Sequence, residues 1–323
     1  WPMTNYWLPA RLHERGSFLA ALIAQRLGDD VLGPIDYWLE MPERLVEEPT
    51  RPQTATRWGT GFLCVDLGPD DHQTWNRFSN LAAEDSDPES VASRAQVWRL
   101  PVTPYRQSCQ HLTLNDTSSA VSVVDMRGRT VIDLTTMWAG PLCTEILARA
   151  GARVIKIEPA SRPDGLRYGD GDDGSGRAPM FMELNRSKEI ADIDLRYCVE
   201  GGEFHRLVRS ADLVITSLSP RANENLGLTP ANLFEINPKL AILSISAFAS
   251  SRNESDWVSY GTGVHAMSGL GWRDNRPLTP AFSYPDPIAG LEACLTALGQ
   301  LTQDVSQCSR VSLDRSASSL VEP

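Results

Sequence analysis

The sequence of 323 residues lacks the patterns that mark several large classes of protein. Its six cysteines are widely spaced without a CxxC pair, and its five histidines form no HxH or HxxxH set. We therefore expect reduced thiols, with no metal site and no disulfide framework. No apolar run approaches the roughly 20 residues needed to cross a bilayer, and we see no signal-peptide pattern. A cytoplasmic protein without a membrane partner is the expectation.

Positive charge is also scarce. Thirty Lys and Arg residues stand against 41 Asp and Glu residues, a formal net charge of -11. Because a phosphate backbone favours Lys and Arg, this balance argues against a general nucleic-acid binder. It leaves room for a local basic pocket that takes a phosphorylated cofactor. With 41% apolar residues, the chain has enough material for one large or two ordinary domains.

Two glycine motifs of nucleotide-binding proteins are missing. The segment TTMWAG, which follows an expected strand at 130–134, lacks G-x-G-x-x-G and so disfavours a Rossmann-type dehydrogenase. The glycines of GDGDDGSGR at 169–177 have no strand directly before them and no GKS or GKT after them. This stretch is therefore not a P-loop, and we expect an acidic surface loop.

The stretch from Thr130 to Glu158 predicts a βαβ unit. Apolar and β-branched residues at 130–134 and 154–157 indicate two buried strands. Ala139-Gly140 is predicted to form the turn, and Pro141 to occupy the first helical position. Gly151 is expected to stop the helix. Such a unit implies a parallel sheet and an α/β fold.

Further strands and helices alternate after this unit. Strands are expected at 189–195, 212–216, 240–246 and 309–313, and helices at 199–208, after Thr229 through Phe234, and at 288–301. A glycine-punctuated loop is expected at 261–271 and a further helix from Ser316. This alternation predicts a doubly wound, Rossmann-like parallel sheet.

The N-terminal part of the chain has a different pattern. A helix capped by Ser17 is expected to end at Gly28, and a proline-containing linker is expected at 47–53. A strand at 59–67 and short helices follow. The polar stretch 107–122 is the best candidate for a boundary. We predict an N-terminal α+β segment over 1–120 and a core domain over 121–323.

Seven segments of the core, taken in order, resemble the family III CoA-transferases, the group of formyl-CoA transferase and carnitine CoA-transferase. They are VIDLTTMWAGPLCTEILARAGARVIKIE, DGLR, LNRSKEIADIDL, ADLVITSLSP, LGLTPANLFEINPKLAILSISAF, YGTGVHAMSGL and YPDPIAGLEACLTAL, within residues 128–315. The resemblance implies an α/β sheet of nucleotide-binding type, an interlocked homodimer, and transfer of CoA between an acyl-CoA and a small carboxylic acid.

The resemblance also implies a nucleophile. In the family it is the aspartate of a D-x-x-x-G motif, which Asp286 and Gly290 match. Its carboxylate would form a mixed anhydride and then an aspartyl-CoA thioester, which are the same chemical species as the substrates, so the steps are nearly isoenergetic. Composition alone favours an ordinary helix N-cap for Asp286, whereas the surrounding motifs favour the nucleophile.

CoA contacts implied by the resemblance fall on three segments. They are Met137, Trp138 and Ala139, then Asn185, Arg186 and Lys188, then Ser217, Leu218 and Asn225. Arg167 and Lys188 are candidates for the CoA phosphates. For these two cations a surface salt bridge is the alternative, and for Trp138 a place in the core.

The acyl pocket is expected to involve Tyr260, His265 and Gly290, although a buried histidine with its hydrogen bonds satisfied is an alternative for His265. An α-methylacyl-CoA racemase uses the same fold but needs a histidine where Tyr260 stands. A non-catalytic CoA-binding subunit is a third reading. Two N-terminal segments resemble the C-terminal part of the family, namely GTGFLCVDLGPDDHQTWNRF at 59–78 and WRLPVTPYR at 98–106. No glycine-rich lid is visible in the sequence. We therefore expect either a rearranged or truncated member, or a two-copy protein in which residues 1–120 are the remnant of a preceding transferase half.

Overall fold

A computed structural model describes most of the chain. It covers residues 8–33, 55–68, 70–107, 123–169, 171–198, 201–273, 276–278, 280, 283–303 and 305–320. The expected linker at 47–53 and nearly all of the expected boundary at 107–122 lie outside these residues.

A six-stranded parallel sheet forms the centre of the molecule, with the order β11-β8-β7-β4-β5-β6. Its strands are β4 (Thr130–Leu134), β5 (Arg153–Ile157), β6 (Glu189–Ala191), β7 (Leu213–Thr216), β8 (Ala241–Ser246) and β11 (Gln307–Ser312). The chain builds β4, β5 and β6 toward one edge and then returns to place β7, β8 and β11 toward the other. This order confirms the predicted doubly wound fold and puts the topological switch point between β4 and β7.

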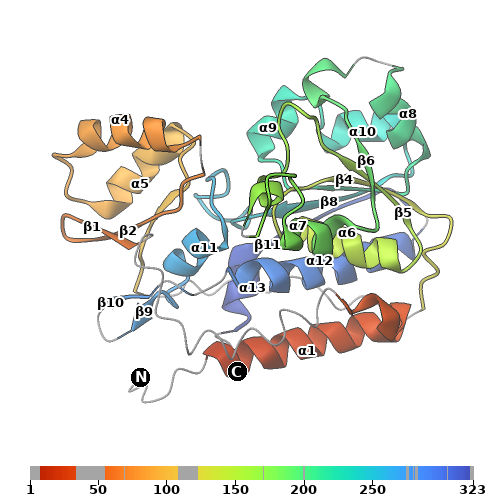
Figure 1. The fold of residues 1–323 in the computed structure, drawn as a ribbon, viewed down its shortest axis with the longest axis horizontal. Coiled ribbons are helices and arrows are strands. Elements are labelled where there is room, and N and C mark those ends of the chain that lie inside the picture. Colours follow the sequence, from red (N-terminus) through yellow and green to blue (C-terminus); the bar gives the residue numbers. More distant parts are fainter. Residues whose placement is uncertain are drawn as a thin grey trace.

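Helices cover both faces of this sheet (Figure 1). On one face lie α6 (Ala139–Arg149) and α12 (Pro285–Leu301), with α1 (Leu8–Leu27) packed on α12. On the other face lie α8 (Glu203–Ser210) and α10 (Pro230–Ile236). The shorter helices are α7 (Pro179–Asn185), α9 (Pro220–Asn225), α11 (Gly261–Met267) and α13 (Leu313–Ser318).

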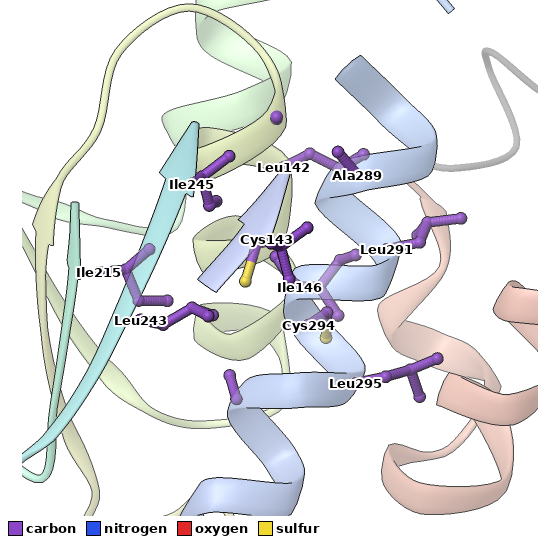
Figure 2. Close-up of a cluster of buried hydrophobic side chains, with 14 of the residues drawn as sticks. Leu142, Cys143, Ile146, Ile215, Leu243, Ile245, Ala289, Leu291, Cys294 and Leu295 are labelled. Carbon is purple, nitrogen blue, oxygen red and sulfur yellow. The ribbon is translucent and has the colours of Figure 1, made fainter. Parts of the chain in front are cut away.

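Alternation along the strands separates the core into two layers. In β8, Leu243 and Ile245 face α6 and α12, whereas Ile242 belongs to the layer beneath α8 and α10. Side chains that alternate in this way cover both faces of a sheet. Figure 2 shows the first layer, in which Cys143 and Ile146 of α6 pack between the sheet and α12.

A smaller unit precedes the large domain. It consists of an antiparallel sheet, β1 (Ala55–Trp58), β2 (Gly61–Val65) and β3 (Val102–Pro104), with α4 (His72–Ala82) and α5 (Pro88–Val97). We call this the N-terminal unit. It has its own apolar cluster and contacts α11 through β2 and β3. In contrast, α1 belongs to the main core. The division of the chain at residue 120 stays a prediction.

Several local predictions were wrong in position. Ser17 lies in the middle of α1, because that helix begins at Leu8. Ala139 and Gly140 are the first residues of α6, so Pro141 occupies its third position. The expected strand at 59–67 includes the turn between β1 and β2.

The predicted loop at 261–271 was also wrong, because residues 261–267 form α11. This helix is almost entirely buried, and its glycines provide space. A Cβ at Gly263 would lie 2.3 Å from Ser259 Oγ and 2.9 Å from Thr103 Oγ1. Close packing against the N-terminal unit therefore explains a glycine that the sequence pattern attributes to a turn.

Candidate active site

The two loops at the switch point are joined by a hydrogen bond. The Thr136 backbone N–H, just after β4, donates to Ser217 Oγ, just after β7, at 3.3 Å. In open α/β sheets, ligands bind where neighbouring loops diverge at the carboxyl ends of the strands. The structure thus brings together two of the three segments predicted to contact CoA.

The loop after β4 leads directly into a helix. Met137 has φ of 68°, which is the left-handed region that side chains other than glycine rarely adopt. Trp138 is the N-cap residue of α6 and packs partly buried against the main core, while Ala139 is buried at the helix start. Backbone strain in a loop at a switch point is typical of a ligand site.

Asp286 is the second residue of α12, with Tyr284 as the N-cap residue. The simple N-cap alternative for Asp286 is therefore wrong. Ser283 Oγ donates a hydrogen bond to Asp286 Oδ2 at 2.5 Å. Gly261 lies against the same carboxylate, because a Cβ there would sit 2.2 Å from Oδ2. Absence of a side chain at Gly261 lets the start of α11 approach this carboxylate.

The pKa of Asp286 is raised to about 6. Burial is the largest cause, and the nearby Asp66 carboxylate raises the pKa further. The Ser283 hydroxyl and backbone hydrogen bonds at Gly261 and Asp286 act in the opposite direction. A carboxylate with this pKa is ionised at neutral pH and is more basic than an exposed aspartate, which suits a nucleophile.

Asp66 comes from the N-terminal unit, directly after β2. It accepts a hydrogen bond from the hydroxyl of Thr262 in α11. Tyr260, the N-cap residue of α11, has a raised pKa because it is partly buried and lies near Asp71 and Asp66. Sequence reasoning did not identify Asp66 or Asp71. The available signal was a group of three carboxylates at the end of an expected strand and just after it, in VDLGPDD.

Gly290, one turn after Asp286 in α12, packs against the start of α6, which follows the loop after β4. A Cβ at Gly290 would lie 2.7 Å from the Ala139 carbonyl oxygen and 3.1 Å from Leu142 Cδ2. Asp286 lies about one helical turn, roughly 5.4 Å, before this contact. The candidate nucleophile therefore lies at the same end of the sheet as the candidate CoA loop. Gly290 itself is a helix-packing residue, which corrects its predicted place in the acyl pocket.

Gly290→Ala is expected to destabilise the fold by about 1–3 kcal/mol, because the added methyl group overpacks the contact between α6 and α12. Urea unfolding monitored by circular dichroism measures this loss. Gly68→Ala is a matched control, since its Cβ would meet nothing closer than Asp71 Oδ2 at 3.4 Å. Equal stability of the two variants would contradict the packing role.

The two predicted phosphate-binding cations are engaged inside the protein. The Lys188 side chain is fully buried, and its Nζ lies 3.0 Å from Asp133 Oδ2 and 2.9 Å from Asn185 Oδ1. Arg167 forms two hydrogen bonds with Glu158 and stacks on Phe181. Both cations form ion pairs, as the salt-bridge alternative supposes, although the pair of Lys188 with Asp133 is fully buried rather than at the surface.

His265 matches the alternative of a buried histidine whose hydrogen bonds are satisfied. It is fully buried, with Nδ1 2.7 Å from Tyr284 Oη and Nε2 2.9 Å from the Leu278 carbonyl oxygen. Since a carbonyl only accepts, Nε2 carries the proton and Nδ1 accepts from Tyr284. Burial lowers the pKa of His265 to about 4, so the ring is neutral. A ring with both nitrogens occupied cannot serve as the base of a racemase.

The remaining predicted residues are distributed around the loops. Leu218 is partly buried at the start of the loop after β7, and its carbonyl accepts from Asn223. Asn225 is exposed at the end of α9. Asn185 is buried at the end of α7, where its amide donates to the Phe181 carbonyl.

Within the described residues, no group of three or more His, Cys, Asp or Glu side chains is arranged to hold a metal ion. No helix in that part of the chain is long and apolar enough to span a bilayer.

The fold and site define a doubly wound α/β protein with a buried carboxylate of raised pKa at a helix start. A family model described as CoA-transferase family III matches residues 126–317. This range covers more than half of the chain and includes both the switch-point loops and Asp286. The chain belongs to CoA-transferase family III.

Known relatives agree with this membership. The succinyl-CoA–D-citramalate CoA-transferase of Chloroflexus aurantiacus is 33% identical over 177 residues, which cover 54% of this chain and 44% of the relative. The acetyl-CoA:oxalate CoA-transferase of Acetobacter aceti is 34% identical over 171 residues, covering 51% and 43%. The chain therefore matches less than half the length of either curated relative.

A solved structure of a CAIB/BAIF family protein from Brucella suis is also similar. Its TM-score is 0.54 at 28% sequence identity, and the match covers 60% of this chain and 54% of that one.

Proposed function

We propose that this chain transfers coenzyme A between an acyl-CoA thioester and a small carboxylic acid, with Asp286 as the nucleophile. One observation carries the proposal. Within the region that matches the family, a carboxylate of raised pKa begins a helix at the end of the sheet where the switch-point loops meet. Both curated relatives are named as transferases that use small acids, citramalate or oxalate.

The proposed reaction proceeds through four exchanges at carbonyl carbons. An Asp286 oxygen attacks the thioester carbonyl, the C–S bond breaks, and CoA leaves as a thiolate while an aspartyl anhydride forms. The thiolate attacks the aspartyl carbonyl, releasing the donor acid and leaving an aspartyl-CoA thioester. An acceptor carboxylate attacks the carbonyl of this thioester, the C–S bond breaks, and a second anhydride forms as CoA leaves again as a thiolate. The thiolate then attacks the acceptor carbonyl, which yields the new acyl-CoA and restores Asp286.

Neighbouring groups support the carboxylate in this role. The Ser283 hydroxyl donates to Asp286 Oδ2 and restricts its orientation. The start of α12 stabilises a negative charge by about 0.3–1 kcal/mol. We propose that Met137, Trp138, Ala139, Ser217 and Leu218 line the path of the CoA moiety, because they belong to the two switch-point loops.

The test is an exchange assay with purified protein. Acetyl-CoA, succinyl-CoA and formyl-CoA are each incubated with isotopically labelled oxalate, citramalate or succinate, and the CoA esters are analysed by mass spectrometry. We expect a labelled CoA ester in at least one combination. Binding of CoA without any exchange would instead support a non-catalytic subunit, and the proposed activity would then be abandoned.

We further propose a homodimer in the cytoplasm, on the basis of the family resemblance. Light scattering after size exclusion is expected to give twice the mass of one chain. A monomer that transfers CoA would show that the second copy is unnecessary. Fluorescent tagging of the chain in its host would test the location.

The pH dependence follows from the groups around Asp286. Because an ionised Asp286 is required, kcat/KM is expected to fall as pH decreases through about 6. Asp66→Asn removes a carboxylate that raises this pKa, so the acid limb should move to lower pH by roughly one unit or less. Ser283→Ala removes a group that lowers the pKa, so the limb should move to higher pH.

The two opposite shifts are measured from pH profiles of initial transfer rates. Asp71→Asn is the matched control, since Asp71 lies in the same unit but is not among the groups that shift Asp286. Identical profiles for all three variants would contradict the assignment of Asp286 as the titrating group.

A further inference from the structure

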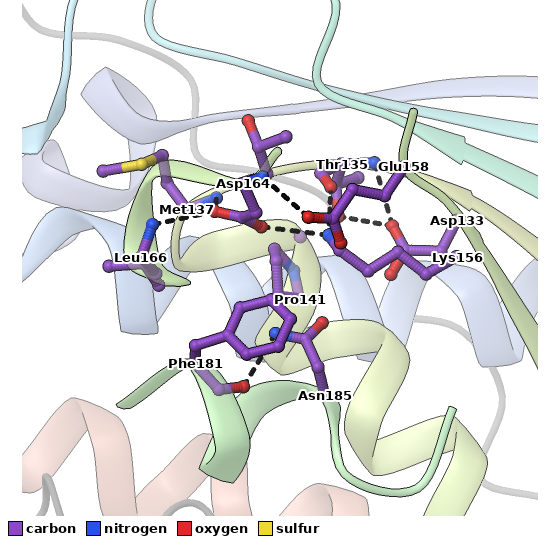
Figure 3. A network of polar contacts seen from close by, with 12 residues as sticks. Asp133, Thr135, Met137, Pro141, Lys156, Glu158, Asp164, Leu166, Phe181 and Asn185 are labelled. Carbon is purple, nitrogen blue, oxygen red and sulfur yellow. Dashed lines mark hydrogen bonds and ion pairs between the residues drawn. The ribbon is translucent and has the colours of Figure 1, made fainter. Parts of the chain in front are cut away.

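A buried charged pair lies next to the loop after β4 (Figure 3). This loop comprises residues 135–138. Lys156 is on β5 and Asp164 follows it, and both side chains are fully buried with Nζ and Oδ2 3.0 Å apart. The same Nζ donates to the Thr135 carbonyl oxygen at 2.7 Å. One end of the loop is thus held by the lysine.

Asp164 holds the other end of the loop. Its Oδ1 accepts from the backbone N–H groups of Met137 and Leu166, each at 3.1 Å. Its own N–H donates to Glu158 Oε1 at 2.8 Å, and Glu158 is held in turn by Arg167. The Asp164 carboxylate therefore cannot move without releasing Met137 or Lys156.

Met137 is the residue that needs this support. Its φ of 68° is strained for a side chain with a Cβ. Its sulfur packs over Gly165, where a Cβ would lie 3.3 Å from it. Since a glycine would adopt this conformation without strain, the chain keeps a bulky side chain at the switch point and stabilises its backbone by other means.

A buried ion pair is a poor source of stability compared with well-packed apolar side chains. Here, however, the pair supplies two specific hydrogen bonds to one loop. Lys156 donates to the Thr135 carbonyl, and Asp164 accepts from the Met137 N–H. Apolar residues of the same size would fill the space but leave Thr135 and Met137 without these bonds.

We propose that Lys156 and Asp164 are positioning residues for CoA-thioester binding, which hold the loop 135–138 in the conformation that accepts the ligand. This inference rests on the proposed function. It assigns to the pair a role in affinity, exerted through Met137 and Thr135 rather than by contact with the ligand.

The test uses Lys156→Met combined with Asp164→Leu, which removes both charges without leaving either one unpaired. Titration calorimetry with CoA gives the dissociation constant, and the transfer assay gives kcat and KM. We expect the dissociation constant and KM to rise at least tenfold, with kcat within about threefold of the unaltered protein. A dissociation constant within twofold, for a folded variant, would overturn the inference.

Rescue separates positioning from general stability. Met137→Gly relieves the backbone strain at this position. Removing the charged pair should therefore raise the dissociation constant less in a Met137→Gly background than it does in the unaltered protein. An equal rise in both backgrounds would count against the inference. Arg129→Met with Asp212→Asn is the control, because this pair lies before β4 and β7 at the opposite end of the sheet. Its dissociation constant should not change.

If the charge-free variant does not fold, Asp164→Asn replaces it. The amide keeps an acceptor for the Met137 N–H but cannot neutralise Lys156. The loop should therefore be held less firmly, and a tenfold rise in the dissociation constant for CoA is again expected. An unchanged dissociation constant overturns the inference. If the unaltered chain binds no CoA, the proposed function fails and the inference fails with it.

Discussion

Asp286→Asn is expected to reduce CoA transfer by about 10³-fold or more, since an amide cannot form the anhydride or the thioester on which the exchange depends. The substitution conserves shape, and asparagine still accepts a hydrogen bond from Ser283. The loss should therefore appear in kcat, while CoA continues to bind with a dissociation constant within a few fold of the unaltered protein.

The intermediate supplies an independent measurement. Incubation with acyl-CoA followed by hydroxylamine should convert an activated aspartyl group into a hydroxamate, which peptide mass spectrometry would locate at Asp286. Asp256→Asn is a matched control, because Asp256 is an exposed carboxylate on a loop. If Asp286→Asn retains exchange at a comparable rate, or if the hydroxamate forms at another residue, the nucleophile has been wrongly assigned.

Lys188→Met is expected to give the largest loss of stability, about 3–5 kcal/mol, because it leaves a buried carboxylate without its closest cation. Asp133 is fully buried on β4, and Lys188 Nζ lies 3.0 Å from its Oδ2. The hydroxyls of Thr135 and Thr144 donate to the same carboxylate. They cannot supply the positive charge that Lys188 provides.

The pH dependence of this loss has a definite sign. Burial opposes ionisation of Asp133, but the ammonium groups of Lys188 and Lys156 lower its pKa well below the usual range. An aspartate with a depressed folded pKa contributes stability above its unfolded pKa of about 3.9, and this contribution is lost as pH falls below it. The difference between the unaltered protein and Lys188→Met should therefore be largest near neutral pH and shrink in acid.

Urea unfolding at pH 7 and at about pH 2.5, which lies below the unfolded pKa, measures both effects. The paired variant Lys188→Met with Asp133→Leu removes the stranded charge and should recover most of the stability. Equal destabilisation of the single and paired variants would show that packing, rather than an unpaired carboxylate, determines the cost.

The amino-acid sequence by itself predicted the large domain well. The strands β4 and β5 with α6 between them follow from apolar periodicity within one contiguous segment, and Gly151 ends the helix with φ of 104° as expected. Thr229 caps α10 because its Oγ1 accepts a hydrogen bond from the Asn232 backbone N–H, which is also a local effect. Such features depend on residues a few positions apart, so a reading of the chain in order detects them.

Charges and glycines were less predictable. Lys188 and Arg167 were expected to face CoA phosphates, yet each is bonded to a carboxylate of the protein, and Asp133 is 55 residues from Lys188. Gly261 and Gly263 indicated a loop by composition, but burial against neighbouring elements makes them part of a helix. A residue type does not specify its partner when several partners of the required charge or size exist.

The sequence alone therefore determined the fold class, the family and the position of Asp286, because these depend on local periodicity and on motifs in a fixed order. Only the tertiary structure decided what surrounds that carboxylate. Asp66 reaches α11 across 196 residues of chain, through packing of the N-terminal unit against that helix. Contacts at such a separation depend on how whole elements pack, and no short pattern in the chain encodes them.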